Sequence, residues 1–112
     1  MKVKQAASQL EALGKPTRLE IYRALIRAGE NGLAVGALQE SLNIAPSTLS
    51  HHLKTLIISG LISQERQATT LICRANYNSM QDLVNYLVSE CCVDQSVGTT
   101  SMCKPTPICK DC

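Results

Sequence analysis

The stretch PSTLSHHLKTLII, residues 46–58, decides the fold of this 112-residue chain. Its leucines recur at helical spacing on one side of a helical wheel, while small polar and basic residues fall on the other side. Pro46 occupies the first position of the stretch, where a helix favours proline. The sequence therefore predicts a helix with one packed face and one presented face. The packed residues are Leu49, Leu53 and Leu56, and the presented residues are Ser47, Thr48, Ser50, His51 and Lys54.

A second, shorter helix is predicted just before this one. Val35, Leu38 and Leu42 follow helical spacing, and Asn43-Ile44-Ala45 forms a tight connection to the next helix. Two short helices joined by about three residues, the second with small polar and basic groups near its start, are typical of a helix-turn-helix.

Two strands are predicted after Gly60, at residues 61–65 and 70–73, on either side of a polar turn at 66–69. A hairpin that follows a helix-turn-helix is a wing. A last helix is predicted at about 79–91, because apolar residues recur there at positions i, i+3, i+4, i+7 and i+8. These residues are Met80, Leu83, Val84, Leu87 and Val88.

Two helices are predicted before residue 30. The first runs from about Gln5 to Leu13 with an apolar face, and the second runs from Pro16 or Thr17 to about Ala28 with another. The two faces comprise Ala6, Leu10 and Leu13, and Leu19, Tyr22 and Ile26. The apolar stripes of the first and last helices exceed what one small protomer can bury. We therefore expect a mainly α fold with a small β-hairpin, a winged helix-turn-helix that forms a homodimer through its first and last helices.

Length and composition limit the alternatives. A chain of 112 residues suits one domain, here expected at 1–92, followed by an irregular cysteine-rich tail at 93–112. Aromatic residues make up only 3% of the chain, which argues against most proteins that bind single-stranded nucleic acid by stacking. No apolar run approaches the roughly 18 residues of a membrane span, and none resembles a signal peptide. We therefore expect a cytoplasmic protein without a membrane partner.

The charge of the chain does not identify a partner by itself. Eleven Lys and Arg residues against nine Asp and Glu residues give a net charge of +2. The presented face of the predicted recognition helix is more informative. Ser47, Thr48, Ser50 and His51 stand where side chains reach base edges and phosphates of double-stranded DNA, and Lys54 and the wing residue Arg66 would contact the DNA backbone. His52 lies beside the leucine face, which favours a packing role.

Two motifs carry a resemblance to a known family. Leu13-Gly-Lys-Pro-Thr-Arg-Leu-Glu-Ile and Ala45-Pro-Ser-Thr-Leu-Ser-His-His-Leu-Lys-Thr-Leu, in this order, closely resemble the ArsR/SmtB family of metal-sensing winged-helix repressors over about residues 6–90. The resemblance implies a cytoplasmic homodimer that binds a palindromic operator and leaves it when an inducer binds. Two positions depart from the family pattern: Ala45 stands at the helix N-cap where Ser is common, and the wing turn Gln67-Ala68-Thr69 lacks the usual glycine.

Two inducer sites known in this family are absent. Arsenic-responsive members often carry Cys-x-Cys at the start of the helix before the recognition helix, but residues 33–40 here contain no cysteine. Zinc-responsive members use histidines and carboxylates along the last helix, whereas both histidines of this chain lie in the predicted recognition helix.

The cysteines remain as the candidate inducer site. Five of the six crowd into the last 22 residues, with Cys91 and Cys92 adjacent at the end of the last helix, followed by Cys103, Cys109 and Cys112. Soft thiolates select thiophilic ions. A vicinal pair with a distal third cysteine resembles an arsenite-sensing variant of the family, which implies As(III) on Cys91, Cys92 and Cys103 as inducer. Sb(III) or methylarsenite would suit the same thiols, and no organic cofactor is expected.

Several alternatives stay open at this point. Cys109 or Cys112 could replace or supplement Cys103, and the ligands could come from one protomer or two. Cys109-x-x-Cys112 could help bind Zn or Cd in a four-sulfur site, and thiol oxidation could be the signal instead. A thiol metalloid carrier without DNA binding would leave the helix-turn-helix unexplained. An enzyme is not expected, because no Gly-rich loop, Ser/His/Asp set or paired carboxylate constellation is present. Cys73, between apolar neighbours on a predicted strand, suits a packing role.

Overall fold

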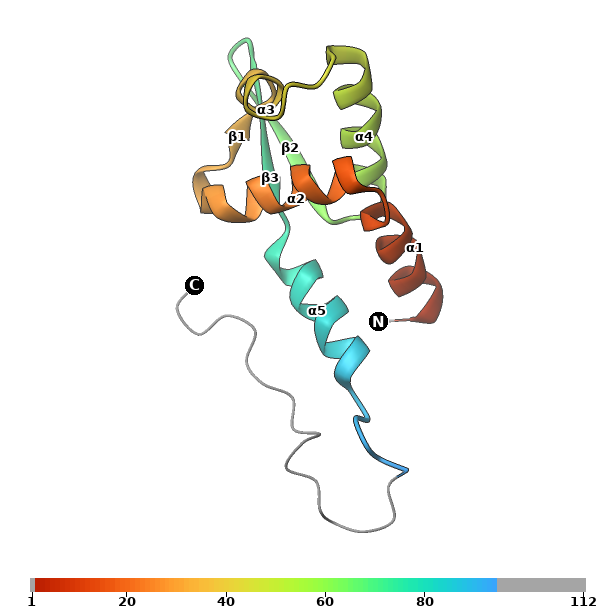
Figure 1. The fold of residues 1–112 in the computed structure, drawn as a ribbon. Helices are drawn as coiled ribbons and strands as arrows, with labels where there is room; N and C mark the ends of the chain where they lie inside the picture. Colours follow the sequence, from red (N-terminus) through yellow and green to blue (C-terminus); the bar gives the residue numbers. More distant parts are fainter. Residues whose placement is uncertain (1, 95–112) are drawn as a thin grey trace.

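The computed structural model describes residues 2–94, in which five α-helices surround a small antiparallel sheet (Figure 1). The elements are α1 (Val3–Leu13), α2 (Pro16–Ala28), a 3-10 turn (Gly29–Asn31), β1 (Leu33–Ala34), α3 (Val35–Leu42), α4 (Pro46–Ile58), β2 (Ile62–Gln67), β3 (Thr70–Ala75) and α5 (Tyr77–Val88). Within these residues, no helix combines the length and the apolar character needed to cross a membrane. The predicted winged helix-turn-helix is confirmed.

The bounds of the central helices follow from local sequence. Both α2 and α4 begin with a proline at their first position, as predicted. Helix α3 ends at Asn43, whose backbone takes the left-handed conformation (φ 53°) that asparagine tolerates at helix ends. The chain can therefore turn sharply from α3 into α4, which places the second helix of the motif against the first.

The buried faces of α1 and α2 differ from the predicted ones. In α1 the buried residues are Ala6, Gln9 and Ala12, while Leu10 is 43% exposed. Helix α2 is likewise rotated, with Leu19 outside and other residues inside, namely Arg18, Ile21, Tyr22 and Leu25. The prediction failed because it assumed that every apolar residue faces the protomer's own core. Small alanines let α1 approach closely, and two long polar side chains are buried by bonding to carbonyls.

The sheet has three strands, in the order β1-β3-β2, rather than the predicted two. β1 pairs with β3 through Leu33–Cys73 and Ala34–Ile72. The chain can pass this close because residue 32 is glycine: its φ is +67°, and a Cβ there would clash with the carbonyl oxygen of Cys73. The third strand fixes the base of the wing to the segment that follows α2.

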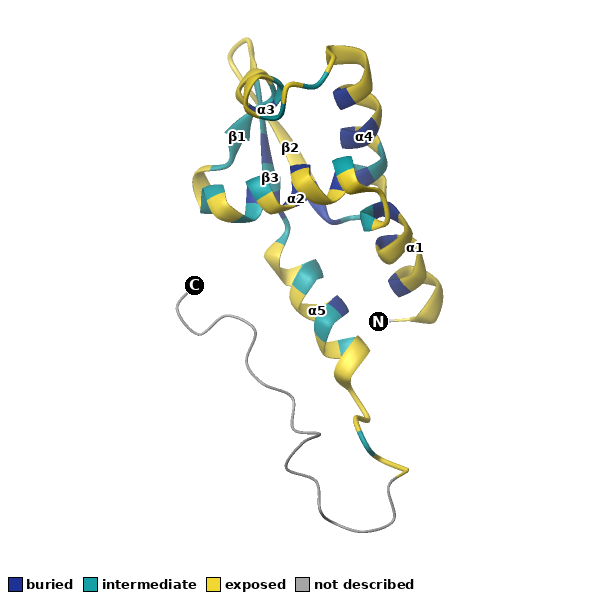
Figure 2. Ribbon diagram, viewed as in Figure 1, coloured by how far each residue is buried: buried dark blue, intermediate teal, exposed yellow. Residues whose placement is uncertain are grey.

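The core lies between α2, α3, α4 and the sheet (Figure 2). Its fully buried apolar side chains come from all of these elements, and the leucines predicted for the packed face of α4 are among its buried residues. Those with no more than 1% exposure are Ile21, Leu25, Leu38, Leu49, Leu56, Leu61 and Cys73. Burial of this kind is the main stabilising contribution to a small domain.

Helix α5 spans Tyr77–Val88 rather than the predicted stretch of about 79–91. It begins earlier because the side chain of Asn76 accepts a hydrogen bond from the backbone N–H of Ser79 at 3.2 Å, which caps the helix. It ends earlier because Ser89 adopts an extended backbone (ψ 148°). Cys91 and Cys92 therefore lie in a turn beyond the helix. Figure 1 shows α1 and α5 at one end of the molecule and the wing tip with the start of α4 at the other.

Candidate functional site

The presented face of α4 is solvent-exposed, as predicted. All five polar residues proposed for DNA contact on this helix are exposed: Ser47, Thr48, Ser50, His51 and Lys54. The leucines on the opposite face hold the helix against the core. Ala45, at the N-cap, provides no side-chain hydrogen bond, so it leaves the first backbone N–H groups of α4 unbonded by a cap. N–H groups in this position suit a phosphate oxygen.

His52 belongs to the packed face and not to the presented one. Its side chain is 9% exposed, and its Nδ1 atom is buried without a hydrogen-bond partner among the described residues. Burial lowers the pKa of His52, and the nearby charges of Arg18, His51 and Lys15 lower it further. The imidazole is thus held neutral inside the fold, which agrees with the packing role.

The wing is braced at its base by Arg74. Its Nη1 atom lies 2.5 Å from Oε1 of Glu65 on β2, and its Nε–H donates to the carbonyl of Glu30 at 2.9 Å. Arg74 also lowers the pKa of the Glu65 carboxyl, first through this hydrogen bond and then through its charge. Ala68 replaces the usual glycine in the turn and adopts φ 56°. Arg66 is exposed near the tip of the wing, where it can reach a DNA backbone.

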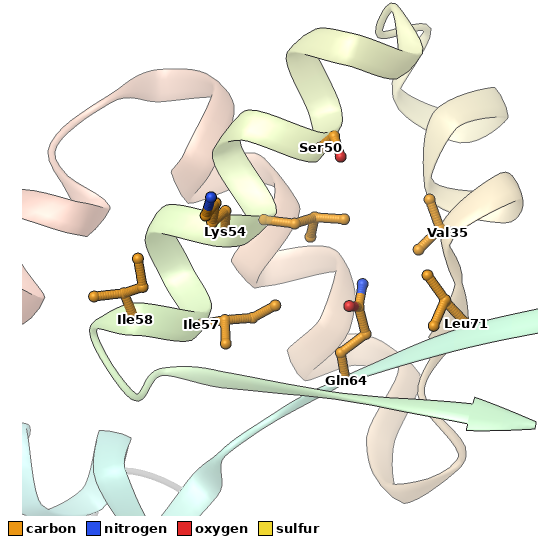
Figure 3. Close-up of a pocket in the computed structure, with 8 residues that line it drawn as sticks. Val35, Ser50, Lys54, Ile57, Ile58, Gln64 and Leu71 are labelled. Carbon is orange, nitrogen blue, oxygen red and sulfur yellow. The ribbon is translucent and has the colours of Figure 1, made fainter.

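A groove separates the recognition helix from the wing (Figure 3). It has a volume of about 440 Å³, and the side chains around it come from α4, the hairpin and the start of α3. Ser50 and Lys54, both proposed for DNA contact, line it from α4, while Gln64 and Leu71 line it from the hairpin. The groove therefore lies within the surface that the presented helix and the wing share.

The cysteine turn lies at the other end of the molecule. Sγ of Cys91 and Sγ of Cys92 are 3.6 Å apart, and Cys91 is exposed. Neighbouring side chains in an extended chain point to opposite faces, but Glu90 and Cys92 have φ near +60° here, which lets the two sulfurs approach. Among residues 2–94, no group of three or more Cys, His, Asp or Glu side chains could hold a metal ion. Cys103, Cys109 and Cys112 lie outside the described residues.

Cys73 is separate from this pair. Its side chain is fully buried on β3, where Nε2 of Gln64 donates to its sulfur at 3.6 Å. Burial raises the pKa of the Cys73 thiol, so the thiolate that reacts with metals and oxidants is disfavoured. The predicted packing role agrees with this environment.

Three structural residues were not singled out from the sequence: Gln9, Arg74 and Asn76. Asparagine directly before a helical pattern is a recognisable N-cap signal, so Asn76 could have been found. Arg74 pairs with Glu65 only once the register of β2 and β3 is known. Gln9 gave no signal, because a glutamine on a helix is usually exposed.

Comparison with known proteins agrees with this architecture. A family model described as a helix-turn-helix domain matches residues 13–65. The arsenical resistance operon repressor of Bacillus subtilis (strain 168) is 33% identical over 97 residues, which cover 85% of this chain and 87% of that protein. The nodulation protein NolR of Rhizobium meliloti is 37% identical over 79 residues, which cover 70% of this chain but only 59% of NolR.

A solved structure shows the same fold. The homodimeric winged helix-turn-helix DNA-binding domain Mb0332 from Mycobacterium bovis superposes with a TM-score of 0.64 at 25% identity, covering 79% of this chain and 82% of that one. The sequence match to the Bacillus protein extends well beyond the helix-turn-helix and takes in most of both chains. The chain belongs to the ArsR/SmtB family of winged helix-turn-helix, DNA-binding transcription regulators.

Proposed function

We propose that this chain is an arsenic-responsive transcriptional repressor. As a homodimer it binds operator DNA, and it is released when trivalent arsenic, antimony or methylarsenite binds the thiolates of Cys91, Cys92 and Cys103. The observation that carries the proposal is the pair of sulfur atoms 3.6 Å apart in the turn after α5. This position is far from the DNA-binding elements in Figure 1, as a separate sensor site requires.

The geometry of the pair suits chelation of a thiophilic ion. A thiolate bound to zinc lies about 2.3 Å from the ion, so two thiolates on one ion lie within about 4.6 Å of each other. The measured separation of Cys91 and Cys92 is shorter than this limit. Because no third donor joins the pair among residues 2–94, a pyramidal three-sulfur site needs a thiol from beyond them, and Cys103 is the next in sequence.

The relative from Bacillus supports the choice of inducer class. Its name assigns it to an arsenical resistance operon, and a match over 85% of a 112-residue chain takes in Cys91 and Cys92 wherever it begins. Only the soft donor set of this chain distinguishes the ion, since neither Cys-x-Cys before α4 nor histidines on α5 are present.

The dimer is supported by apolar side chains left outside the protomer. Helices α1 and α5 contact each other, and both carry exposed apolar residues. On α5, Leu87 is 54% exposed and Val88 is 37% exposed; on α1, Val3 is 68% exposed and Leu10 is 43% exposed. An isologous dimer would bury these residues and would present two α4 helices to a palindromic operator.

The direct test counts titratable thiols in the fully reduced chain after addition of arsenite or, separately, zinc. We expect arsenite to protect about three of the six thiols, and none of them in a chain ending at Glu90. Cys103→Ser should reduce the protection, whereas the double substitution of Cys109 and Cys112 by Ser should not. Protection of four thiols by zinc and none by arsenite would contradict the proposed inducer.

The second test measures release from DNA. A duplex selected from random sequence by the arsenite-free protein is titrated with protein in the presence and absence of arsenite. We expect arsenite to weaken binding of the natural chain, while the variant with Cys91→Ser and Cys92→Ser binds the duplex normally and does not respond. Loss of DNA binding in that variant without arsenite would contradict a separate sensor site.

A further inference from the structure

The three backbone carbonyls that follow the recognition helix, at residues 59–61, each accept a hydrogen bond from a different part of the molecule than α4. The carbonyl of Ser59 is bonded from α1, and the carbonyls of Gly60 and Leu61 are bonded from the start of α5. Carbonyls in this position have no helical partner of their own and must be satisfied otherwise. The C-terminal end of α4 is thus tied to the two helices proposed to form the dimer.

The bond from α1 is made by Gln9. Its side chain is fully buried, and its Nε2 donates to the Ser59 carbonyl at 3.2 Å, across fifty residues of sequence. The Oε1 atom of the same amide is buried without a hydrogen-bond partner among the described residues. A buried, half-satisfied amide is costly compared with an apolar residue. Gln9 therefore does not improve packing; its contribution is the fixed connection between α1 and α4.

The bonds from α5 are made by Asn76, which connects three segments. Its backbone N–H donates to the Leu61 carbonyl at 2.8 Å, and its Nδ2 donates to the Gly60 carbonyl at 3.2 Å. Its Oδ1 meanwhile caps α5 by accepting from the Ser79 N–H. One carboxamide therefore fixes both the first turn of α5 and the end of α4, so the angle between the two helices cannot change without breaking these bonds.

We propose that Asn76, supported by Gln9, is a positioning residue that sets the orientation of α4 relative to the dimer helices and hence the spacing of the two recognition helices on DNA. Neither residue touches DNA in this proposal; each acts through α4. A dimer reads two half-sites at a fixed separation, so a loosened connection costs affinity for the paired half-sites and little for a single one. The inference rests on the proposed dimeric DNA binding and not on the identity of the inducer.

Asn76→Asp separates positioning from folding. The carboxylate keeps the acceptor that caps α5, but it removes the N–H donor and places an oxygen opposite the Gly60 carbonyl. Asn78→Asp is the matched control, because Asn78 is exposed in the same first turn of α5 and makes none of these contacts. Gln9→Met is the second variant, since it keeps the volume of the side chain and removes the bond from α1.

Each protein is titrated against the duplex selected by the wild-type chain, against duplexes with the two half-sites moved one base pair closer or farther apart, and against a duplex with a single half-site. We expect Asn76→Asp to lower affinity for the selected duplex by about fivefold or more, the lower end of usual coupling between sites, with less than about a twofold change for the single half-site. Its preference for the selected spacing should be weaker than that of the wild type. Gln9→Met should show a smaller change of the same kind, and Asn78→Asp no change.

Two results would overturn the inference while leaving the proposed function intact: retention of the full spacing preference by both variants, or equal losses on the paired and single half-sites. If Asn76→Asp does not fold, as circular dichroism would reveal, Gln9→Met decides the question alone. A wild-type chain that selects only single half-sites would instead refute the proposed dimeric DNA binding, and the inference with it.

Discussion

The winged-helix body, residues 16–75, and the end formed by α1 and α5 are built differently. In the body, α2, α3, α4 and the sheet bury an almost complete apolar core, and the exposed positions of α4 are mostly polar. Helix α5 buries only Leu83 and leaves Leu87 exposed by 54%. The body therefore has the interior of a closed domain, whereas the α1 and α5 end has the surface expected of a protomer that pairs with a second copy.

The largest effect should come from breaking the body. Leu56→Ala removes a fully buried side chain from α4 and should lower the free energy of unfolding by about 2–5 kcal/mol. Ile58→Ala is the control on the same helix, because Ile58 is 77% exposed; its effect should stay within about 0.5 kcal/mol. Denaturant unfolding followed by circular dichroism measures both. Equal effects of the two substitutions would contradict the assignment of the packed face.

The next effect should separate the protomers without unfolding them. Leu87→Lys places a charge on the exposed apolar face of α5, and an unpaired charge in the proposed interface should cost about 3 kcal/mol, roughly a hundredfold in the dimer dissociation constant. Asn85→Lys adds the same charge at an exposed polar position of α5 and should not change assembly. Sedimentation velocity over a concentration series distinguishes them. A dimer that tolerates Leu87→Lys would place the interface elsewhere.

A smaller effect concerns the DNA end of the body. If Lys54 contacts a phosphate, Lys54→Ala should make the slope of log affinity against log salt less steep by about 0.9, because one fewer counterion contact is released. Arg66→Ala should act similarly from the wing. Lys4→Ala, on α1 at the opposite end of the molecule, removes the same charge and should leave the slope unchanged. Fluorescence anisotropy with a labelled duplex at several salt concentrations supplies the slopes.

The smallest effect should be on the pH dependence of stability. The folded pKa of His52 is lowered, first by burial, so below about pH 6.5, the usual value for histidine, the unfolded chain binds a proton that the folded chain resists. The contribution of His52 to stability is therefore fully present above that pH and declines as the pH falls toward the folded pKa. His52→Gln should flatten the change in thermal midpoint between pH 8 and pH 5.5.

The control for this titration is the neighbouring histidine. His51 is exposed on the presented face of α4, so His51→Gln should keep the wild-type decline in thermal midpoint. If His51→Gln flattens the profile and His52→Gln does not, the assignment of the two faces of α4 is wrong. The comparison thus tests the burial of a single side chain within the recognition helix.

Sequence reasoning succeeded where structure is determined locally. The bounds of α4 follow from Pro46 and from three leucines at helical spacing, and the structure confirms them. The choice of faces on α1 failed, because periodicity does not distinguish the protomer's own core from a second interface; Leu10 is outside and Gln9 is inside. β1 was missed because two residues form a strand only through pairing with β3, forty residues away.

The candidate sensor site was accessible from sequence only as a set of residue types. Thiols without accompanying histidines predict a soft ion, and their order along the chain predicts which are close. The proximity of the sulfurs of Cys91 and Cys92 depends on a left-handed backbone at Cys92, a conformation that no residue pattern predicts there. Likewise, Asn76 is recognisable as a helix cap, but its bond to Gly60 requires the tertiary fold.

The location of the cysteine turn has a kinetic consequence for the proposed repressor. Because Cys91 is exposed at the end of the molecule away from the wing tip and the start of α4, bound DNA would not cover it. An inducer can therefore bind the repressor while it still occupies the operator and accelerate its dissociation directly. The speed of the transcriptional response is then set by inducer capture and induced release, and does not have to wait for spontaneous departure of the repressor.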